Sequence, residues 1–175
     1  MIDFSRDYFA LFGLPVRYRF DPVELDRAYR ALQSEVHPDR YASADESERR
    51  LALQSSARVN EAYRALKDPA GRAQYLLSLR GIDALAETNT VLPQEFLERE
   101  LERREALADA HAARDATRLE GLLRAVRSDA AALESSLANR LDAEDWNAAG
   151  DAVRELRFLS KVAGDIEAAL VEVED

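Results

Sequence analysis

Few side chains in this sequence belong to the types that carry out covalent chemistry. There is no cysteine, which excludes disulfides, thiolate metal ligands and cysteine nucleophiles. The only histidines are His37 and His111, which disfavours a histidine-based metal site. The sequence contains no glycine-rich phosphate loop, no Gly-x-Ser-x-Gly turn and no nucleophile beside a base. We therefore predict a protein that is not an enzyme and that needs no metal and no cofactor.

The tripeptide His37-Pro38-Asp39 is the short segment whose residue types best suit a specific polar contact. Asp39 presents a carboxylate that can accept two hydrogen bonds from an arginine of a partner. Pro38 stiffens the turn, and His37 can form a hydrogen bond or pack at a helix end. A simpler interpretation of the tripeptide alone is a histidine in the last turn of a helix that a proline ends. The choice between the two depends on the elements around it.

Those elements are predicted to be helices. Asp21 at the N-cap, Pro22 at the first helical position and Glu24 two positions later form a strong helix start. Apolar residues then recur at steps of three and four until Pro38, which disfavours helical backbone at the residue before it. The predicted helices of this half span about 7–12, 21–37, 45–66 and 70–79, with a loop at 38–44.

The second half is predicted to form a helical bundle. Residues 81–92 show no clear period and are interpreted as a connection between domains. Apolar residues at three- and four-residue steps follow, with short connections, which favours an antiparallel bundle of three long helices. The expected fold class is all-α, because strong helix formers dominate and glycine and proline are few. The three helices span about 93–112, 115–141 and 145–173.

Charge is divided unequally between the two halves. Residues 1–80 carry 13 basic and 12 acidic side chains, a net charge of +1, whereas residues 81–175 carry 11 and 22, a net charge of −11. Nucleic-acid binding is disfavoured because phosphate contacts need a basic surface. A neutral half beside an acidic half suggests two different binding roles. Neither a signal peptide nor an apolar run long enough to span a membrane is recognisable, so a cytoplasmic protein is expected.

The first helix of the second half has an acidic stripe. On a helical wheel, one side is expected to face the bundle, carboxylates occupy another side, and Leu97 and Leu101 lie between the two. Like charges four residues apart destabilise a helix slightly, so the stripe does not serve helix stability. It is either a solvated face or a partner site of leucines flanked by carboxylates. The expected bundle-facing residues are Phe96, Leu107, Ala108 and His111, and the acidic ones are Glu95, Glu98, Glu102, Glu105 and Asp109.

Three further side chains are singled out by position. Phe158 lies at the edge of the apolar stripe of its helix, where it either packs against a neighbouring helix or serves as an exposed anchor for a partner. His111 is interpreted as structural, because no second histidine or cysteine stands near it in the sequence. Trp146 is expected in the core or at a domain interface.

The order of motifs resembles the HscB family, the J-domain co-chaperones of iron–sulfur cluster assembly. The resemblance is specific over residues 7–81 and looser beyond, notably at Thr90-Val91-Leu92 and 153–159. The motifs that carry it are the opening Asp-Tyr-Phe-x-Leu-Phe-Gly-Leu-Pro at 7–15, His37-Pro38-Asp39, Asn60-Glu61-Ala62-Tyr63 and the segment 72–81.

The resemblance implies a J domain at 1–80, a helical hairpin with short flanking helices, that stimulates the ATPase of a DnaK-class, HscA-like chaperone. The exposed tripeptide would dock beside the nucleotide domain of that chaperone. In J domains the partner-facing side of the second helix is usually basic, whereas here it also carries Asp26 and Glu35. Docking is therefore expected to be weak or restricted to one dedicated chaperone. The implied chaperone-binding residues are Arg27, Arg30, His37, Pro38, Asp39 and Arg40.

The resemblance also implies that the bundle at 93–175 binds an IscU-like iron–sulfur scaffold protein, with 81–92 as the connection. Glu98 stands where the family often has an apolar residue and is not included in the predicted site. Glycine-rich and cysteine-rich zinc segments, which generic J proteins carry for other clients, are absent. A purely structural helical module with a fortuitous tripeptide is the remaining alternative. The implied scaffold-binding residues are Leu97, Leu101, Glu102, Glu105, Asp109 and Phe158.

Overall fold

The computed structural model describes residues 2–86 and 91–174. Within these ranges the chain forms α-helices and one short 3-10 helix and contains no β-strand, so the predicted all-α class is confirmed. Contacts divide the chain into two compact units, Met1–Leu79 and Arg80–Asp175. Each unit has its own apolar core.

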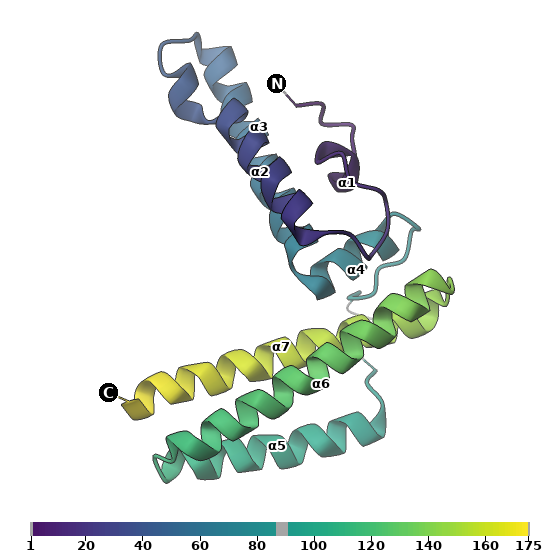
Figure 1. The fold of residues 1–175 in the computed structure, drawn as a ribbon, viewed down its shortest axis with the longest axis vertical. Coiled ribbons are helices and arrows are strands. Elements are labelled where there is room, and N and C mark those ends of the chain that lie inside the picture. The colour runs from purple at the N-terminus through teal and green to yellow at the C-terminus, as the bar shows by residue number, and fades with distance from the viewer. Residues whose placement is uncertain (1, 87–90, 175) are drawn as a thin grey trace. The chain divides into compact units, whose positions relative to one another are not determined.

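The N-terminal unit is built around an antiparallel helical hairpin (Figure 1). Two long helices form the hairpin. One short helix precedes them in the chain and packs beside the hairpin, and another short helix follows them and ends the unit. Its core includes Phe9, Leu25, Val59 and Leu66, which are fully buried. The elements in chain order are α1 (Tyr8–Leu11), α2 (Pro22–Val36), η1 (Pro38–Tyr41), α3 (Glu46–Lys67) and α4 (Pro69–Ser78).

Aspartates start these helices, as the sequence indicated for α2. The Asp21 carboxylate accepts a hydrogen bond of 2.9 Å from the Val23 N–H, which satisfies one of the unpaired donors of the first turn. Asp7, Asp45 and Asp68 cap α1, α3 and α4 in the same way. The predicted helix bounds are therefore met within one or two residues.

The segment 38–44 differs from the predicted loop, because its first part is the 3-10 helix η1. Pro38 supplies the helical φ at the first position, where the missing N–H costs nothing. The His37 Nδ1 atom accepts a hydrogen bond of 3.3 Å from the Asp39 N–H and so caps the turn. The tripeptide is thus held in a defined helical turn.

The C-terminal unit is the predicted three-helix bundle. The long helices α6 (Ala116–Asp142) and α7 (Trp146–Glu174) run antiparallel, and α5 (Gln94–Ala112) packs along them (Figure 1). The core includes Phe96, Leu119, Val126 and Ile166. Asp115 and Asp145 accept hydrogen bonds from backbone N–H groups at the starts of α6 and α7.

The face that α5 turns inward differs from the predicted one. Phe96 is buried as expected, but Ala108 and His111 are exposed, and Glu100 and Ala110 are buried instead. The side chain of Arg103 forms ion pairs with both Glu100 and Asp129 of α6. A prediction from hydropathy assigns glutamate to the solvent-exposed side of a helix. Because Glu100 is buried with Arg103, the predicted inward face of α5 was wrong by part of a turn.

The two turns of the bundle each place a side chain in the left-handed region. Arg114 has a φ of 50° and Glu144 a φ of 57°. In both turns the N–H groups of three successive residues bond back to the preceding helix, as in a Schellman-type helix end. Glycine favours this backbone conformation, and a side chain at either position strains it.

Glu144→Gly is expected to raise the free energy of unfolding by about 0.5–1 kcal/mol, since relief of the left-handed strain exceeds the entropy that glycine adds to the unfolded chain. Arg114→Gly is expected to gain less, because Arg114 Nη2 donates a hydrogen bond of 2.9 Å to the Val173 carbonyl at the end of α7. Urea denaturation of both variants measures the difference. A destabilised Glu144→Gly protein would contradict the strain argument.

The described parts of the predicted connection, 81–86 and 91–92, are attached to the bundle. Arg154 of α7 donates hydrogen bonds of 3.2 Å to the Ala84 carbonyl and 3.3 Å to the Val91 carbonyl. Ala84 is fully buried, and its side chain faces Gly150. Arg80 lies over the ring of Trp146, which is partly buried in this unit. Thr90, part of the looser resemblance, lies outside the described residues.

Arg154→Ala is expected to free this segment from α7, because two backbone carbonyls lose their donor at a cost of about 1–2 kcal/mol. Amide hydrogen exchange in residues 81–86 and 91–92 should then accelerate about tenfold, with the rest of the bundle unchanged. Lys161→Ala, at an exposed position of the same helix, is the control. Equal acceleration throughout the bundle would mean that Arg154 stabilises the whole unit and not the segment.

Candidate functional sites

The tripeptide His37-Pro38-Asp39 lies in the turn that joins the two hairpin helices. His37 directly follows α2, and its Nδ1 atom lies 3.5 Å from Oδ2 of Asp39. The side chains are 49% exposed for His37 and 89% exposed for Asp39. Neither side chain belongs to the core, so both are available for a partner. The contact of His37 with the Asp39 N–H is local and agrees with either interpretation of the tripeptide, so its role in binding a partner stays a prediction.

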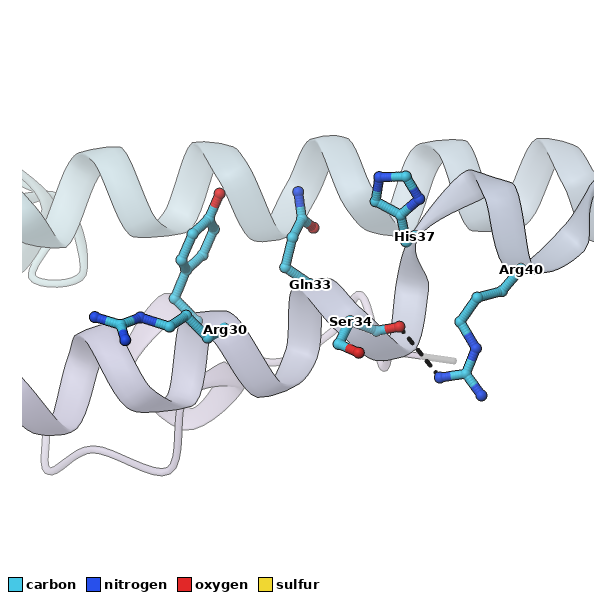
Figure 2. Close-up of a pocket in the computed structure, with 6 residues that line it drawn as sticks. Arg30, Gln33, Ser34, His37 and Arg40 are labelled. Atoms are coloured by element: carbon cyan, nitrogen blue, oxygen red, sulfur yellow. Dashed lines mark hydrogen bonds between the residues drawn. The ribbon is translucent and has the colours of Figure 1, made fainter.

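A shallow groove of about 450 Å³ runs from the tripeptide along α2 (Figure 2). Figure 2 shows Arg40 turned back towards the end of α2, where its Nη1 atom donates a hydrogen bond of 3.1 Å to the Ser34 carbonyl. The negative end of the helix dipole stabilises a cation at this position. The groove is lined by Tyr29, Arg30, Gln33, Ser34, His37 and Arg40.

Helix α3 fixes the floor of this groove. The Asn60 Oδ1 atom accepts hydrogen bonds from the Tyr29 hydroxyl at 2.9 Å and from Gln33 Nε2 at 3.0 Å. The Ser56 hydroxyl donates to Gln33 Oε1 at 3.3 Å. Sequence reasoning missed Tyr29, Gln33 and Ser34 as lining residues. The four-residue spacing of Tyr29, Gln33 and His37, which places them on one helix face, was the available signal.

Asp26, one of the acidic residues that reduce the positive charge of α2, is paired inside the hairpin. Lys67 Nζ lies 2.7 and 3.0 Å from the two carboxylate oxygens of Asp26, and the Tyr63 hydroxyl donates to Asp26 at 3.0 Å. The hydrogen bond from Lys67, followed by that from Tyr63, holds the pKa of Asp26 below its usual value. The exposed Arg27 and Arg30 therefore stand beside a carboxylate whose charge α3 already balances.

The predicted partner face on α5 is exposed. Leu97 is 46% and Leu101 is 60% exposed, values that are high for large apolar side chains of a folded protein. Phe158 of α7 is half-buried and packs edge-on against Phe96, with ring centroids 5.5 Å apart. Phe158 thus makes the packing contact, and its role as an anchor for a partner stays a prediction. The carboxylates of Glu102, Glu105 and Asp109 all belong to exposed residues.

The titratable side chains of the described residues form no candidate metal site. None of their histidine, aspartate and glutamate side chains gather in a group of three that could hold a metal ion. Exposed His111 lies 2.9 Å from Glu172 of α7, at the edge of the bundle. In the described part of the chain no helix combines the length and the hydropathy required to cross a bilayer.

A helical hairpin with an exposed His-Pro-Asp turn defines a J-domain protein, and the model of the DnaJ domain matches residues 7–75. A second family model, described as the HSCB C-terminal oligomerisation domain, matches residues 92–167. Together the two models cover most of the chain, which therefore belongs to the HscB co-chaperone family. This confirms the resemblance predicted from the motifs.

Individual relatives agree with the family models. The chain is 49% identical to the co-chaperone protein HscB homolog of Cupriavidus taiwanensis, over 97% of this chain and 96% of that relative. The homolog from Ralstonia nicotianae is 46% identical over 98% of each chain. Among solved structures, the chaperone HscB from Vibrio cholerae is 36% identical, with a TM-score of 0.85 over 96% of this chain and 99% of that one. Human co-chaperone HscB also gives 0.85 at 26% identity, over 95% of this chain and 83% of that one.

Proposed function

We propose that this protein is a two-site adaptor that brings an iron–sulfur scaffold protein to a DnaK-class chaperone and stimulates the ATPase of that chaperone. The observation that carries the proposal is that one chain presents two exposed surfaces of different chemistry. One is the His37-Pro38-Asp39 turn with its arginine-lined groove, and the other is the leucine and carboxylate face of α5. The proposed division of labour is a J domain at 1–80, a connection at 81–92 and a scaffold-binding bundle at 93–175.

At the first surface, the Asp39 carboxylate accepts a bidentate pair of hydrogen bonds from an arginine of an HscA-like chaperone. His37 and Pro38 hold that carboxylate in the 3-10 turn. Arg27, Arg30 and Arg40 meet acidic groups of the chaperone and speed the encounter. The nucleotide and the groups that hydrolyse it belong to the chaperone. The adaptor acts by favouring the chaperone conformation that hydrolyses ATP, through its differential affinity for that conformation.

At the second surface, Leu97, Leu101 and Phe158 bury against an apolar patch of an IscU-like scaffold. Glu102, Glu105 and Asp109 then meet lysines or arginines around that patch. The net charge of −11 in residues 81–175 steers a basic partner to this half of the chain. The proposed compartment is the cytoplasm.

The test is the ATPase rate of the chaperone, measured with and without this protein and with and without the scaffold. The adaptor proposal expects stimulation by this protein alone and greater stimulation when the scaffold is added, because the scaffold is delivered as client. Stimulation without any scaffold effect would identify a J protein that serves other clients. No stimulation in any mixture would contradict the proposal and favour a purely structural module.

A further inference from the structure

A row of polar and aromatic contacts joins one face of α2 to one face of α3. The rings of Tyr29 and Tyr63 stack with their centroids 4.0 Å apart, and the Tyr63 hydroxyl donates a hydrogen bond to Asp26. Nearer the tripeptide, Asn60 of α3 accepts hydrogen bonds from Tyr29 and Gln33 of α2. Because the contacts recur at three- and four-residue steps on both helices, they fix which side chains α2 turns towards α3.

Asn60 is the member of this row that accepts two hydrogen bonds from α2. Its Oδ1 atom lies 2.9 Å from the Tyr29 hydroxyl and 3.0 Å from Gln33 Nε2. An amide oxygen has two lone pairs, so both are used within the hairpin. The Ser56 hydroxyl donates to Gln33 Oε1 at 3.3 Å. Helix α3 therefore holds the Gln33 amide group at both of its polar atoms.

Asparagine at this position has a cost for the helix. It is a poor helix former inside a helix, and its half-buried amide loses part of its contact with water. The hairpin is held together by its apolar core, in which Leu25, Val59 and Leu66 are fully buried. What Asn60 adds to that core is the orientation of the two side chains that it bonds.

Those two side chains, Tyr29 and Gln33, line the groove beside His37. Figure 2 shows the Gln33 side chain extended from α2 towards α3. Glutamine has much rotamer freedom to lose, and a side chain released from α3 would lie across the groove in part of its rotamers. A partner would then have to order both side chains on binding, which lowers its affinity.

We propose that Asn60 is a positioning residue for the chaperone-binding groove and acts through Tyr29 and Gln33. The inference rests on the proposed function, in which a DnaK-class chaperone is the partner at this surface. Asn60 then sets the affinity for the chaperone, because it keeps the groove in the shape that the partner meets. The maximal stimulation depends on the tripeptide and not on Asn60.

The test is a titration of the chaperone ATPase with the full-length protein. In Asn60→Ala, the concentration that gives half-maximal stimulation should rise about tenfold, the cost of ordering two side chains on binding, while the maximal stimulation stays the same. In a protein that already carries Tyr29→Phe and Gln33→Ala, Asn60→Ala should have no further effect, because both of its partners are gone. Gln54→Ala removes an exposed amide from the same helix and is the control, with an unchanged half-maximal concentration.

A second measurement needs no chaperone. NMR relaxation of the Gln33 side-chain amide should show a rigid group in the wild type and fast motion in Asn60→Ala. A rigid Gln33 amide in Asn60→Ala would overturn the inference, as would a further effect of Asn60→Ala beside Tyr29→Phe and Gln33→Ala, which would make Asn60 a direct contact. An unchanged half-maximal concentration in Asn60→Ala, with normal stimulation by the wild type, overturns this inference alone. If the wild type stimulates no chaperone, the proposed function fails and the inference fails with it.

Discussion

Asp39→Asn and His37→Gln are each expected to abolish stimulation of the chaperone ATPase while leaving the protein folded. Asparagine removes the charge that a bidentate arginine contact requires. Loss of one member of a charged interfacial pair costs about 2 kcal/mol or more, which corresponds to binding that is about thirtyfold weaker. Glutamine at position 37 cannot supply the ring nitrogen that caps the Asp39 N–H, so the turn loses its defined geometry.

Two measurements separate an effect on folding from an effect on stimulation of the chaperone ATPase. Both side chains are substantially exposed, so the thermal unfolding midpoint should change little, and scaffold binding should be unaffected. Glu24→Gln, an exposed carboxylate at the opposite end of α2, is the matched control and should stimulate normally. Full stimulation by Asp39→Asn in a purified ATPase assay would remove the tripeptide from the proposed chaperone contact.

The second large effect is expected on the bundle. Replacement of Leu97, Leu101 and Phe158 by alanine should weaken scaffold binding about thirtyfold or more, because buried apolar anchors carry most of the energy of such interfaces. Basal ATPase stimulation without scaffold should remain. Titration calorimetry with the purified scaffold measures the affinity, and an unchanged dissociation constant would place the second site elsewhere.

Phe158 also packs on Phe96, so its replacement affects the stability of the bundle as well as the binding of the scaffold. Its truncation removes an aromatic pair from the bundle, which costs about 0.5–1.5 kcal/mol beyond the lost apolar burial. The double variant Leu97→Ala, Leu101→Ala avoids this complication, since both side chains are exposed and outside the core. Val171→Ala, at another exposed apolar position of the bundle, is the matched control and should bind the scaffold normally.

Much of the fold could be predicted from local sequence. Asp21 and Pro22 predicted the start of α2, Pro38 its end, and the structure agrees within about one residue. The prediction failed where a polar residue is buried. Glu100 lies inside the bundle paired with Arg103 of the same helix, and Arg103 also pairs with Asp129 of α6, a contact between helices that no local pattern predicts.

The candidate sites also differ in how far local sequence predicts them. The tripeptide, the exposed leucines and the acidic stripe could be read as linear motifs, since helical spacing alone places them on one face or in one turn. The groove beside His37 could not, because its floor depends on Asn60, which is 27 residues from Gln33 and on the other arm of the hairpin.

The sequence by itself determined the helices, the rigid turn at His37-Pro38-Asp39 and the unequal distribution of charge, since each follows from residues close together in the chain. Only the tertiary structure decided which polar groups are paired. It joined Asp26 to Lys67 across 41 residues and Arg103 to Asp129 across 26. Those pairings decide what each surface offers, because a carboxylate that is balanced within the fold attracts a partner less.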